Sequence, residues 1–140
     1  MSLEIQCLSP YRWRTREDYA VLTPIRGHVV EAAYYRLTGE GMLWIRSGYA
    51  WDGTSGGVRD TAENLGASLV HDAFYQMLRE DQLPLNLRGR IDRLFGEHCR
   101  KLGTPRGRAR LYVWALRVFG KRHATKEQLE VAPTTAIPVP

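Results

Sequence analysis

The chain has 140 residues, of which 44% are hydrophobic and 25% are charged, and its formal net charge at pH 7 is +5. This composition is typical of one globular domain and excludes wholesale disorder. The apolar runs are short, so no transmembrane helix is expected, and the first residues lack the pattern of a secretory signal. Cys7 and Cys99 form no disulfide framework and no zinc motif, so we expect reduced, buried thiols in a protein made in a cytosol.

The charge is distributed unevenly along the chain. Residues 1–85 hold eight arginines and eleven acidic residues, which gives −3. Residues 86–126 hold twelve basic and two acidic residues, which gives +10, and residues 127–140 contribute −2. A basic C-terminal half predicts an anionic partner such as nucleic acid, lipid headgroups or an acidic protein face. The alternative interpretation is that these arginines only lie on solvent-exposed helix faces and bind no partner.

Residues 1–50 have the pattern of a small antiparallel β-sheet. Apolar residues that alternate with polar ones, or β-branched and aromatic residues in runs, mark four stretches: 3–7, 19–23, 29–37 and 42–45. The glycines in the segment 38–41 predict a turn, so a hairpin is expected between the last two stretches.

A glycine-rich loop is expected over residues 48–57, which hold four glycines and no regular apolar period. The backbone of such a segment adopts unusual dihedral angles or approaches another group closely, which is typical of a functional loop. Trp51 lies inside it and either covers a ligand or anchors the loop.

Three helices are expected after the loop. The first has apolar residues at spacings of three and four over residues 65–78, with Asp60 or Thr61 as its cap. The second carries an apolar stripe over residues 91–102 and is closed by Gly103. A short link joins the two, so they should pack as an antiparallel pair.

The third helix is expected to open at Thr104-Pro105 and to stop at Gly120. Its predicted buried side chains are Leu111, Trp114, Ala115 and Val118. The predicted fold class is therefore α+β, with a small N-terminal antiparallel sheet, the glycine-rich loop, three helices and an extended C-terminal tail. We expect one domain over residues 1–123 and a tail over residues 124–140, which lack a core pattern and end in a proline-rich sequence.

The first helix carries an unusual polar stripe beside its apolar face. Helical spacing places four polar residues on this stripe: Ser68, Asp72, Tyr75 and Arg79. His71 stands next to the stripe, one turn before Tyr75, and the second helix offers Asp92. Because the two helices are expected to be antiparallel, His71 and Asp92 can meet in the groove between them.

A paired histidine and aspartate have a defined chemistry. The carboxylate of Asp92 would fix the imidazole tautomer of His71, whose other nitrogen could then take a proton from water or a hydroxyl. Asp72 would be left to bind a cation together with carbonyl oxygens of the glycine-rich loop, a set of ligands that suits calcium best. The alternative is a buried hydrogen-bonded network of His71, Tyr75 and Asp92 that only ties helix to helix.

Four segments in this order resemble a family found mostly in tailed phages and prophages, catalogued as domain of unknown function 1353. They are GYAWDGTS (48–55), LVHDAFY (69–75), DRLF (92–95) and YVWALRVFG (112–120). The positions that match the family pattern are Asp52, Ser55, His71, Asp72, Tyr75, Arg88, Asp92, Phe95, Arg117 and Gly120. Gly56-Gly57 depart from it, since the family has a proline soon after the serine. The resemblance covers roughly residues 10–120 and implies a phage or prophage source.

A second, more distant similarity is to secreted phospholipase A2, in which a glycine-rich loop precedes an HDxxY helix and an aspartate follows on the next antiparallel helix. This similarity implies that His71 is the base and Asp92 its orienting partner. It also implies that Asp72 is the calcium carboxylate, that Tyr75 is a supporting hydroxyl, and that Trp51 and Gly53 offer loop carbonyls. The disulfides of those enzymes are absent here, and Asp52 has no counterpart in them.

Two functions are consistent with these patterns. The first is an accessory or virion-associated structural protein of a tailed phage, a head or tail component that carries a phospholipase-A2-like site, active or decayed. Its partners would be other phage structural proteins or a second copy, and its location the bacterial host cytoplasm and the virion. The second is a calcium-dependent phospholipid esterase that acts on anionic lipid of the host membrane during entry or lysis. The arginines match no nucleic-acid motif, so no sequence-specific recognition of nucleic acid is expected.

Overall fold

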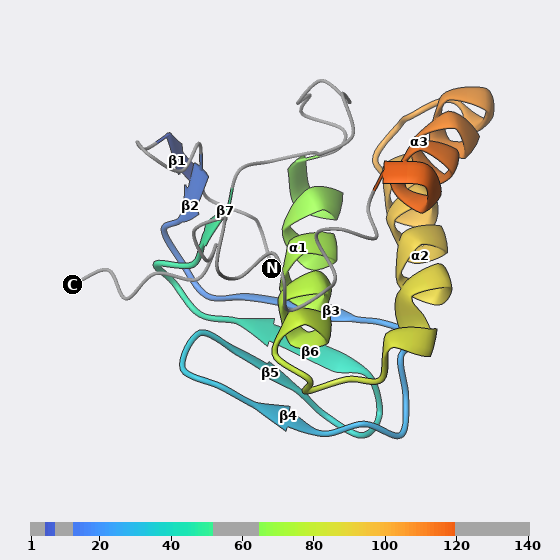
Figure 1. Ribbon diagram of the computed structural model, residues 1–140. Helices are drawn as coiled ribbons and strands as arrows, with labels where there is room; N and C mark the ends of the chain where they lie inside the picture. The colour runs from blue at the N-terminus through green and yellow to red at the C-terminus, as the bar shows by residue number, and fades with distance from the viewer. Residues whose placement is uncertain (1–4, 8–12, 52–64, 120–140) are drawn as a thin grey trace. The chain divides into compact units, whose positions relative to one another are not determined.

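The computed structural model describes residues 5–7, 13–51 and 65–119. It confirms the α+β fold class, with antiparallel strands before residue 52 and three helices after residue 64 (Figure 1). The chain divides between residues 52 and 53 into two compact units, called the β unit and the helical unit below. The domain bounds expected from the sequence, 1–123 with a tail over 124–140, stay a prediction, and the tail lies outside the described residues.

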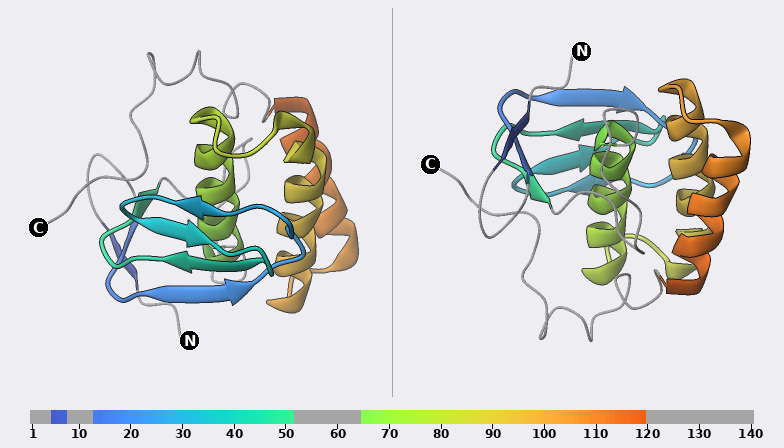
Figure 2. Two further views of the ribbon diagram at one scale, coloured as in Figure 1. Left: turned by 90° about the horizontal axis from the view of Figure 1, so that it is seen from below. Right: turned by 90° about the horizontal axis from the view of Figure 1, so that it is seen from above.

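The β unit contains two small antiparallel sheets. One has the strand order β1-β2-β7 and the other the order β3-β6-β5-β4 (Figure 2). The strands are Ile5–Cys7 (β1), Trp13–Thr15 (β2), Tyr19–Leu22 (β3), Val30–Glu31 (β4), Tyr35–Leu37 (β5), Met42–Ile45 (β6) and Ala50–Trp51 (β7). In the larger sheet Ile45 pairs with both Tyr19 and Tyr35, which makes β6 a central strand. Leu37 and Leu43 also pair and are fully buried, so these strands supply the core of the β unit.

The predicted hairpin between β5 and β6 is present. The Thr38 amide donates to the Met42 carbonyl, and the Gly41 amide donates to the Thr38 carbonyl, each over 3.0 Å. Gly41 has φ +95°, and a Cβ at this position would collide with the backbone carbonyl oxygen of Thr23. Only glycine fits both the dihedral angle and the close approach.

Three parts of the β unit differ from the sequence-based expectation. The run 29–37 is two short strands rather than one, because the chain turns between β4 and β5, where the Ala32 amide donates to the Tyr35 carbonyl. Strand β2 was not predicted. Strand β7 lies within the stretch predicted as a loop, 48–57, and Trp51 at its end is fully buried and pairs with Trp13.

The helical unit consists of α1 (Leu65–Arg79), a short 3-10 helix (Leu85–Leu87), α2 (Arg88–Lys101) and α3 (Arg106–Phe119). Helix α2 packs against both α1 and α3, and Figure 1 shows α1 and α2 side by side and antiparallel, as predicted. Gly103 has φ +111° just after α2, which agrees with its predicted role as the residue that closes this helix.

The buried face predicted for α3 is wrong at three of its four residues. Leu111, Trp114 and Val118 are 58%, 57% and 52% exposed, and only Ala115 is buried. The face that packs in the helical unit carries Leu116 and Ala109 instead. Apolar residues occur at helical spacing on both faces of α3, so periodicity alone does not choose the face that packs in the helical unit.

None of the three helices between residues 65 and 119 is long and apolar enough to cross a membrane.

Candidate functional site

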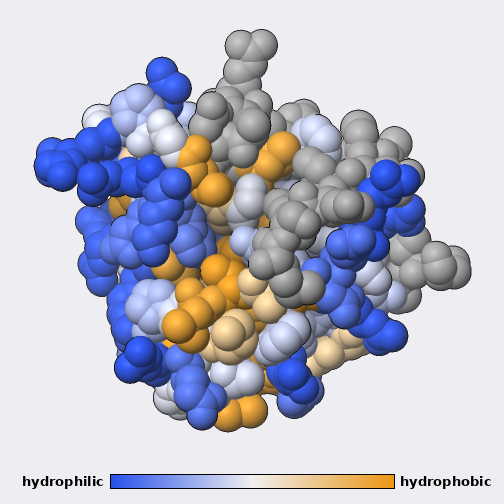
Figure 3. Space-filling view, turned by 180° about the vertical axis from the view of Figure 1, so that it is seen from behind, coloured by the Kyte–Doolittle hydropathy of each residue, from blue (hydrophilic) through white to orange (hydrophobic). Residues whose placement is uncertain are grey.

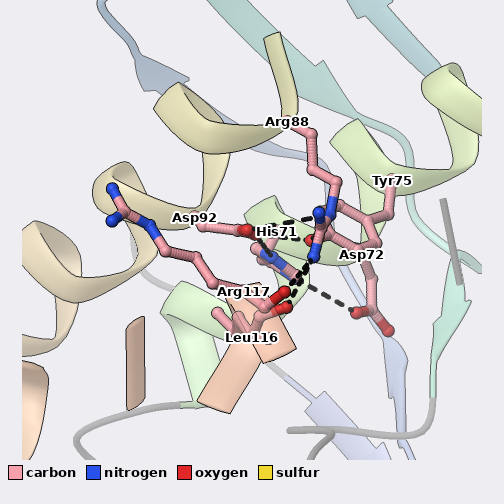
Figure 4. Close-up of polar contacts among 7 residues, drawn as sticks. All are labelled: His71, Asp72, Tyr75, Arg88, Asp92, Leu116 and Arg117. Carbon is pink, nitrogen blue, oxygen red and sulfur yellow. Dashed lines mark hydrogen bonds and ion pairs between the residues drawn. The ribbon is translucent and has the colours of Figure 1, made fainter. Parts of the chain in front are cut away.

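Helix α1 brings His71 and Tyr75 to Asp92 of α2. The two α1 residues are four positions apart, so they lie one above the other on a single face of the helix. His71 Nε2 lies 2.9 Å from Asp92 Oδ1, and the Tyr75 hydroxyl donates to the same oxygen over 2.6 Å (Figure 4). The structure thus brings together the three residues that the sequence analysis named as catalytic.

The network around Asp92 is withdrawn from solvent. The exposed fractions of Asp92, Tyr75 and His71 are 0%, 3% and 4%. A buried carboxylate is costly unless charge and hydrogen bonds compensate it, and here two donors converge on Oδ1. The second oxygen, Oδ2, is buried and accepts no hydrogen bond from the described residues.

Arg88 is the cation of this network, and the sequence analysis gave it no role beyond matching the family pattern. Its Nε lies 3.9 Å from Asp92 Oδ2 and donates to the Tyr75 hydroxyl over 3.3 Å. Its Nη2 donates to the backbone carbonyls of Leu116 and Arg117 over 2.9 and 2.8 Å. Carbonyls in the last turn of a helix lack partners inside that helix, so Arg88 also caps α3. The i,i+4 spacing of Arg88 and Asp92 was the signal in the sequence.

Aromatic rings hold the imidazole of His71 in place. The Tyr75 ring centroid lies 4.1 Å from that of His71, and the Phe95 ring meets the imidazole edge to face at 5.3 Å. Phe95 belongs to an apolar cluster that joins the three helices, together with Ala67, Cys99 and Leu116. The cluster fixes α1 against α2 and so sets the distance between His71 and Asp92.

The bond to Asp92 decides which nitrogen of His71 can act as a base. A carboxylate only accepts hydrogen bonds, so Nε2 carries a proton and the neutral ring keeps its lone pair at Nδ1. Nδ1 faces Asp72 Oδ1 at 3.9 Å, which is too long for a direct hydrogen bond. The neutral form of His71 can therefore accept a proton at Nδ1 from a water molecule that binds beside Asp72.

The two carboxylates determine the protonation of His71. Burial acts to lower the pKa of His71, but Asp72 and Asp92 outweigh it, and the pKa lies above the usual value of 6.5. Burial and the charge of Asp92 raise the pKa of Tyr75, which therefore stays a neutral hydrogen-bond donor. The network thus favours a charged imidazolium, and the neutral base forms only at higher pH.

Of the other predicted site residues on α1, Arg79 is the last residue of the helix, and the hydrogen bonds and ion pairs that Asp92 forms with described residues go to His71, Tyr75 and Arg88. Ser68 turns its hydroxyl back to the carbonyl of Leu65. Trp51 belongs to β7 of the β unit, while Asp52, Gly53 and Ser55 lie outside the described residues.

The described residues alone do not form a metal site. Among residues 5–7, 13–51 and 65–119, no group of three or more His, Cys, Asp or Glu side chains is arranged to hold a metal ion. Asp72 supplies one carboxylate, and calcium takes six to eight oxygen ligands. The loop carbonyl expected from Gly53 falls outside the described residues, so calcium binding stays a prediction, and the chemistry below involves protein side chains and water alone.

Cys99 takes no part in the chemistry of this site. It is fully buried, and burial raises the pKa of its thiol to about 12. A thiol in this environment is a poor nucleophile and behaves as part of the core. The prediction of a reduced, buried cysteine is confirmed for Cys99.

Comparison of the chain with protein-family models, with curated proteins and with solved structures finds no match. The resemblances described above therefore stay predictions, and the argument for a function rests on the geometry of the site.

Proposed function

We propose that this chain is an accessory protein of a tailed phage whose helical unit hydrolyses ester bonds of phospholipids. The observation that carries the hydrolytic part is the orientation of His71, whose Nε2 is bound to Asp92 while Nδ1 lies 3.9 Å from Asp72 Oδ1, beyond hydrogen-bond distance. The phage part rests on the order of the sequence motifs, which the geometry neither adds to nor opposes.

In this proposal the Nδ1 atom of His71 accepts a proton from water, and the resulting hydroxide attacks the ester carbonyl carbon. Asp92 stabilises the imidazolium that forms, as the carboxylate of a catalytic dyad does. When the tetrahedral intermediate collapses, the bond from the acyl carbon to the alcohol oxygen breaks. The imidazolium returns the proton to that oxygen, so the products are a fatty acid and an alcohol.

One feature favours a hydrolytic site over a network that only joins helices. Asp72 is 18% exposed, so solvent reaches the side chain that faces Nδ1 of His71.

The test is release of fatty acid from phospholipid vesicles by the purified full chain, compared with His71→Gln. General base catalysis contributes about 10²–10⁴-fold, so His71→Gln should lose at least about 100-fold in rate. His98→Gln, which removes a histidine of α2 outside the network, is the matched control and should keep the rate. The rate of the unaltered chain should rise with pH through a value above 6.5, because the pKa of His71 is raised.

Two results would overturn the hydrolytic proposal. One is a chain that releases no fatty acid, with or without added calcium. The other is equal activity of the unaltered chain and a folded His71→Gln variant. Calcium is tested in the same assay: loss of activity on chelation, restored by calcium and weakened in Asp72→Asn, is the result expected if Asp72 holds the cation.

The phage assignment has its own measurement. An antibody to the chain should detect it in purified particles of the phage that encodes it, at a constant ratio to the capsid protein. Its absence from particles, with the chain present only in lysing cells, would favour the alternative of an esterase that acts during lysis.

A further inference from the structure

A groove of about 300 Å³ lies between α2 and α3, in the helical unit. Its floor is formed by Gly96 of α2 with Ala109 and Val113 of α3. A Cβ on Gly96 would lie 2.5 Å from Val113 Cγ2, so the two helices approach closely because residue 96 has no side chain. The floor of the groove is therefore shallow, apolar and rigid.

Four arginines surround this floor. Arg93 and Arg100 come from α2, Arg110 and Arg117 come from α3, and all four are exposed. None of their side chains forms a hydrogen bond or ion pair with another described residue. Glu97 also lines the groove, so the charged residues around it have a net charge of +3. In Figure 4 the guanidinium of Arg117 points away from the His71 network. Four like charges gathered around one small groove favour a bound anion, and guanidinium groups match phosphate oxygens best.

An exposed apolar stripe borders the groove on α3. Leu111, Trp114 and Val118 are each more than half exposed and follow one another at helical spacing. Trp114 lies four residues after Arg110 and three before Arg117, so the stripe adjoins the arginines of the rim. On the side of the molecule where α2 and α3 lie, Figure 3 shows mostly hydrophilic residues with apolar patches beside them. Helix α3 carries four arginines and no acidic residue.

We propose that this groove and stripe, Arg93, Arg100, Arg110 and Arg117 with Leu111, Trp114 and Val118, are a binding surface for anionic phospholipid. The arginines would hold the headgroup phosphate over the apolar floor, and the stripe would enter the boundary between headgroups and acyl chains. Tryptophan, leucine and basic residues on one helix are typical of contact with a lipid surface. A soluble phosphate compound would use the arginines and leave the stripe unexplained. The choice of lipid agrees with, and in part rests on, the proposed hydrolase.

The experiment measures co-sedimentation of the full chain with vesicles of ether-linked phospholipid, which carry no ester bond to hydrolyse. Binding is therefore observed whether or not the His71 site is active. The chain should bind phosphatidylglycerol vesicles more tightly than phosphatidylcholine vesicles, and added salt should weaken this preference.

Three variants locate the contact on the surface. Arg110→Gln should weaken binding to phosphatidylglycerol vesicles about fivefold, because one basic residue near an anionic surface is worth about 1 kcal/mol. Arg108→Gln removes the same charge from the same helix outside the groove and should weaken binding less. Leu111→Ser should weaken binding to both kinds of vesicle. All three side chains are exposed, so the variants should fold.

The proposal fails if Arg108→Gln and Arg110→Gln weaken binding equally, since the groove would then have no special role. It also fails if the chain binds DNA but no vesicle, which would make the surface one for nucleic acid. Failure of hydrolysis with vesicle binding intact would overturn the proposed function and leave this surface standing.

Discussion

Helix α2 takes part in two interfaces, one of which buries a charged residue while the other keeps its charged residues in solvent. Against α1 it buries Asp92, which meets His71 and Tyr75 in a network shielded from water. Against α3 it buries small and apolar groups around Gly96 and leaves Arg93 and Arg100 in solvent at the rim. The first interface depends on a few exact polar contacts, and the second depends on close packing.

This difference predicts how substitutions at the two interfaces affect stability. A buried charge is tolerated only with its partners in place, so removal of one member of the α1–α2 network has a large effect on folding. An exposed arginine contributes little to stability, so substitution of the four at the α2–α3 groove should leave the fold intact. Substitutions at the two interfaces should therefore separate stability from binding.

The largest effect is expected from Asp92→Asn. This substitution removes the charge that His71 and Arg88 face, and it places an amide where two donors now converge on Oδ1. Breaking a buried pair in this way costs about 3–5 kcal/mol, so the free energy of unfolding, measured with urea, should fall by that amount.

Glu97→Gln is the matched control, because it neutralises an exposed carboxylate on the same helix. Its free energy of unfolding should stay within about 0.5 kcal/mol of the unaltered chain. Equal losses in the two variants would show that the network around Asp92 has no special role in the fold.

A smaller effect is expected where packing alone is changed. In Gly96→Ala the new methyl group meets Val113 Cγ2 at 2.5 Å, so either the Val113 side chain changes rotamer or α2 and α3 separate slightly. Overpacking of this kind typically costs about 1–3 kcal/mol. The melting temperature should fall. Vesicle binding should weaken as well if the packing at the floor of the groove sets the spacing of the four arginines.

Gly89→Ala provides the comparison for this change. It lies on the same helix, with no heavy atom within 4 Å of the new Cβ. Alanine is favoured over glycine inside a helix by about 0.5–1 kcal/mol, so this variant should be slightly more stable. A Gly96→Ala variant that is also stabilised would contradict the close packing of α2 and α3.

Much of the helical unit could be predicted from apolar periodicity, because the apolar residues of α1 and α2 repeat at helical spacing, although α1 is buried on more than one face. Helix α3 could not be oriented in this way, since Leu111, Trp114 and Val118 form a second apolar stripe with larger side chains. The inward face carries Ala109 and Leu116 instead, and periodicity alone does not distinguish the two apolar faces. Strands β2 and β7, of three and two residues, are too short to give a periodic signal.

The meeting of His71 and Asp92 was expected because both residues lie beside the apolar stripes of two antiparallel helices. The contacts of Arg88 with α3 were harder to predict. Its partners there are the backbone carbonyls of Leu116 and Arg117, and a backbone carbonyl does not depend on the residue type. The unsatisfied Oδ2 of Asp92 depends on side-chain geometry and could not be predicted at all.

The last effect concerns the dependence of stability on pH, and it belongs to the α1–α2 interface, where His71 lies between two carboxylates. The pKa of His71 in the folded chain is raised above its value of about 6.5 in the unfolded chain. Its stabilising contribution is therefore complete below pH of about 6.5 and is lost as pH rises through the folded pKa. The decline is limited to about 1.4 kcal/mol per pH unit, the value for one proton.

The measurement is the free energy of unfolding against pH for the unaltered chain and for His71→Gln, taken as a difference so that other groups cancel. This difference should shrink as pH rises above about 6.5. His98, whose pKa is lowered by burial and by Lys101, contributes in the opposite sense and is removed by the subtraction. If His71→Gln does not fold, the ring protons of His71 in the unaltered chain can be titrated by NMR. A midpoint below 6.5 would mean that burial outweighs Asp72 and Asp92, and the network would then hold a neutral imidazole at physiological pH.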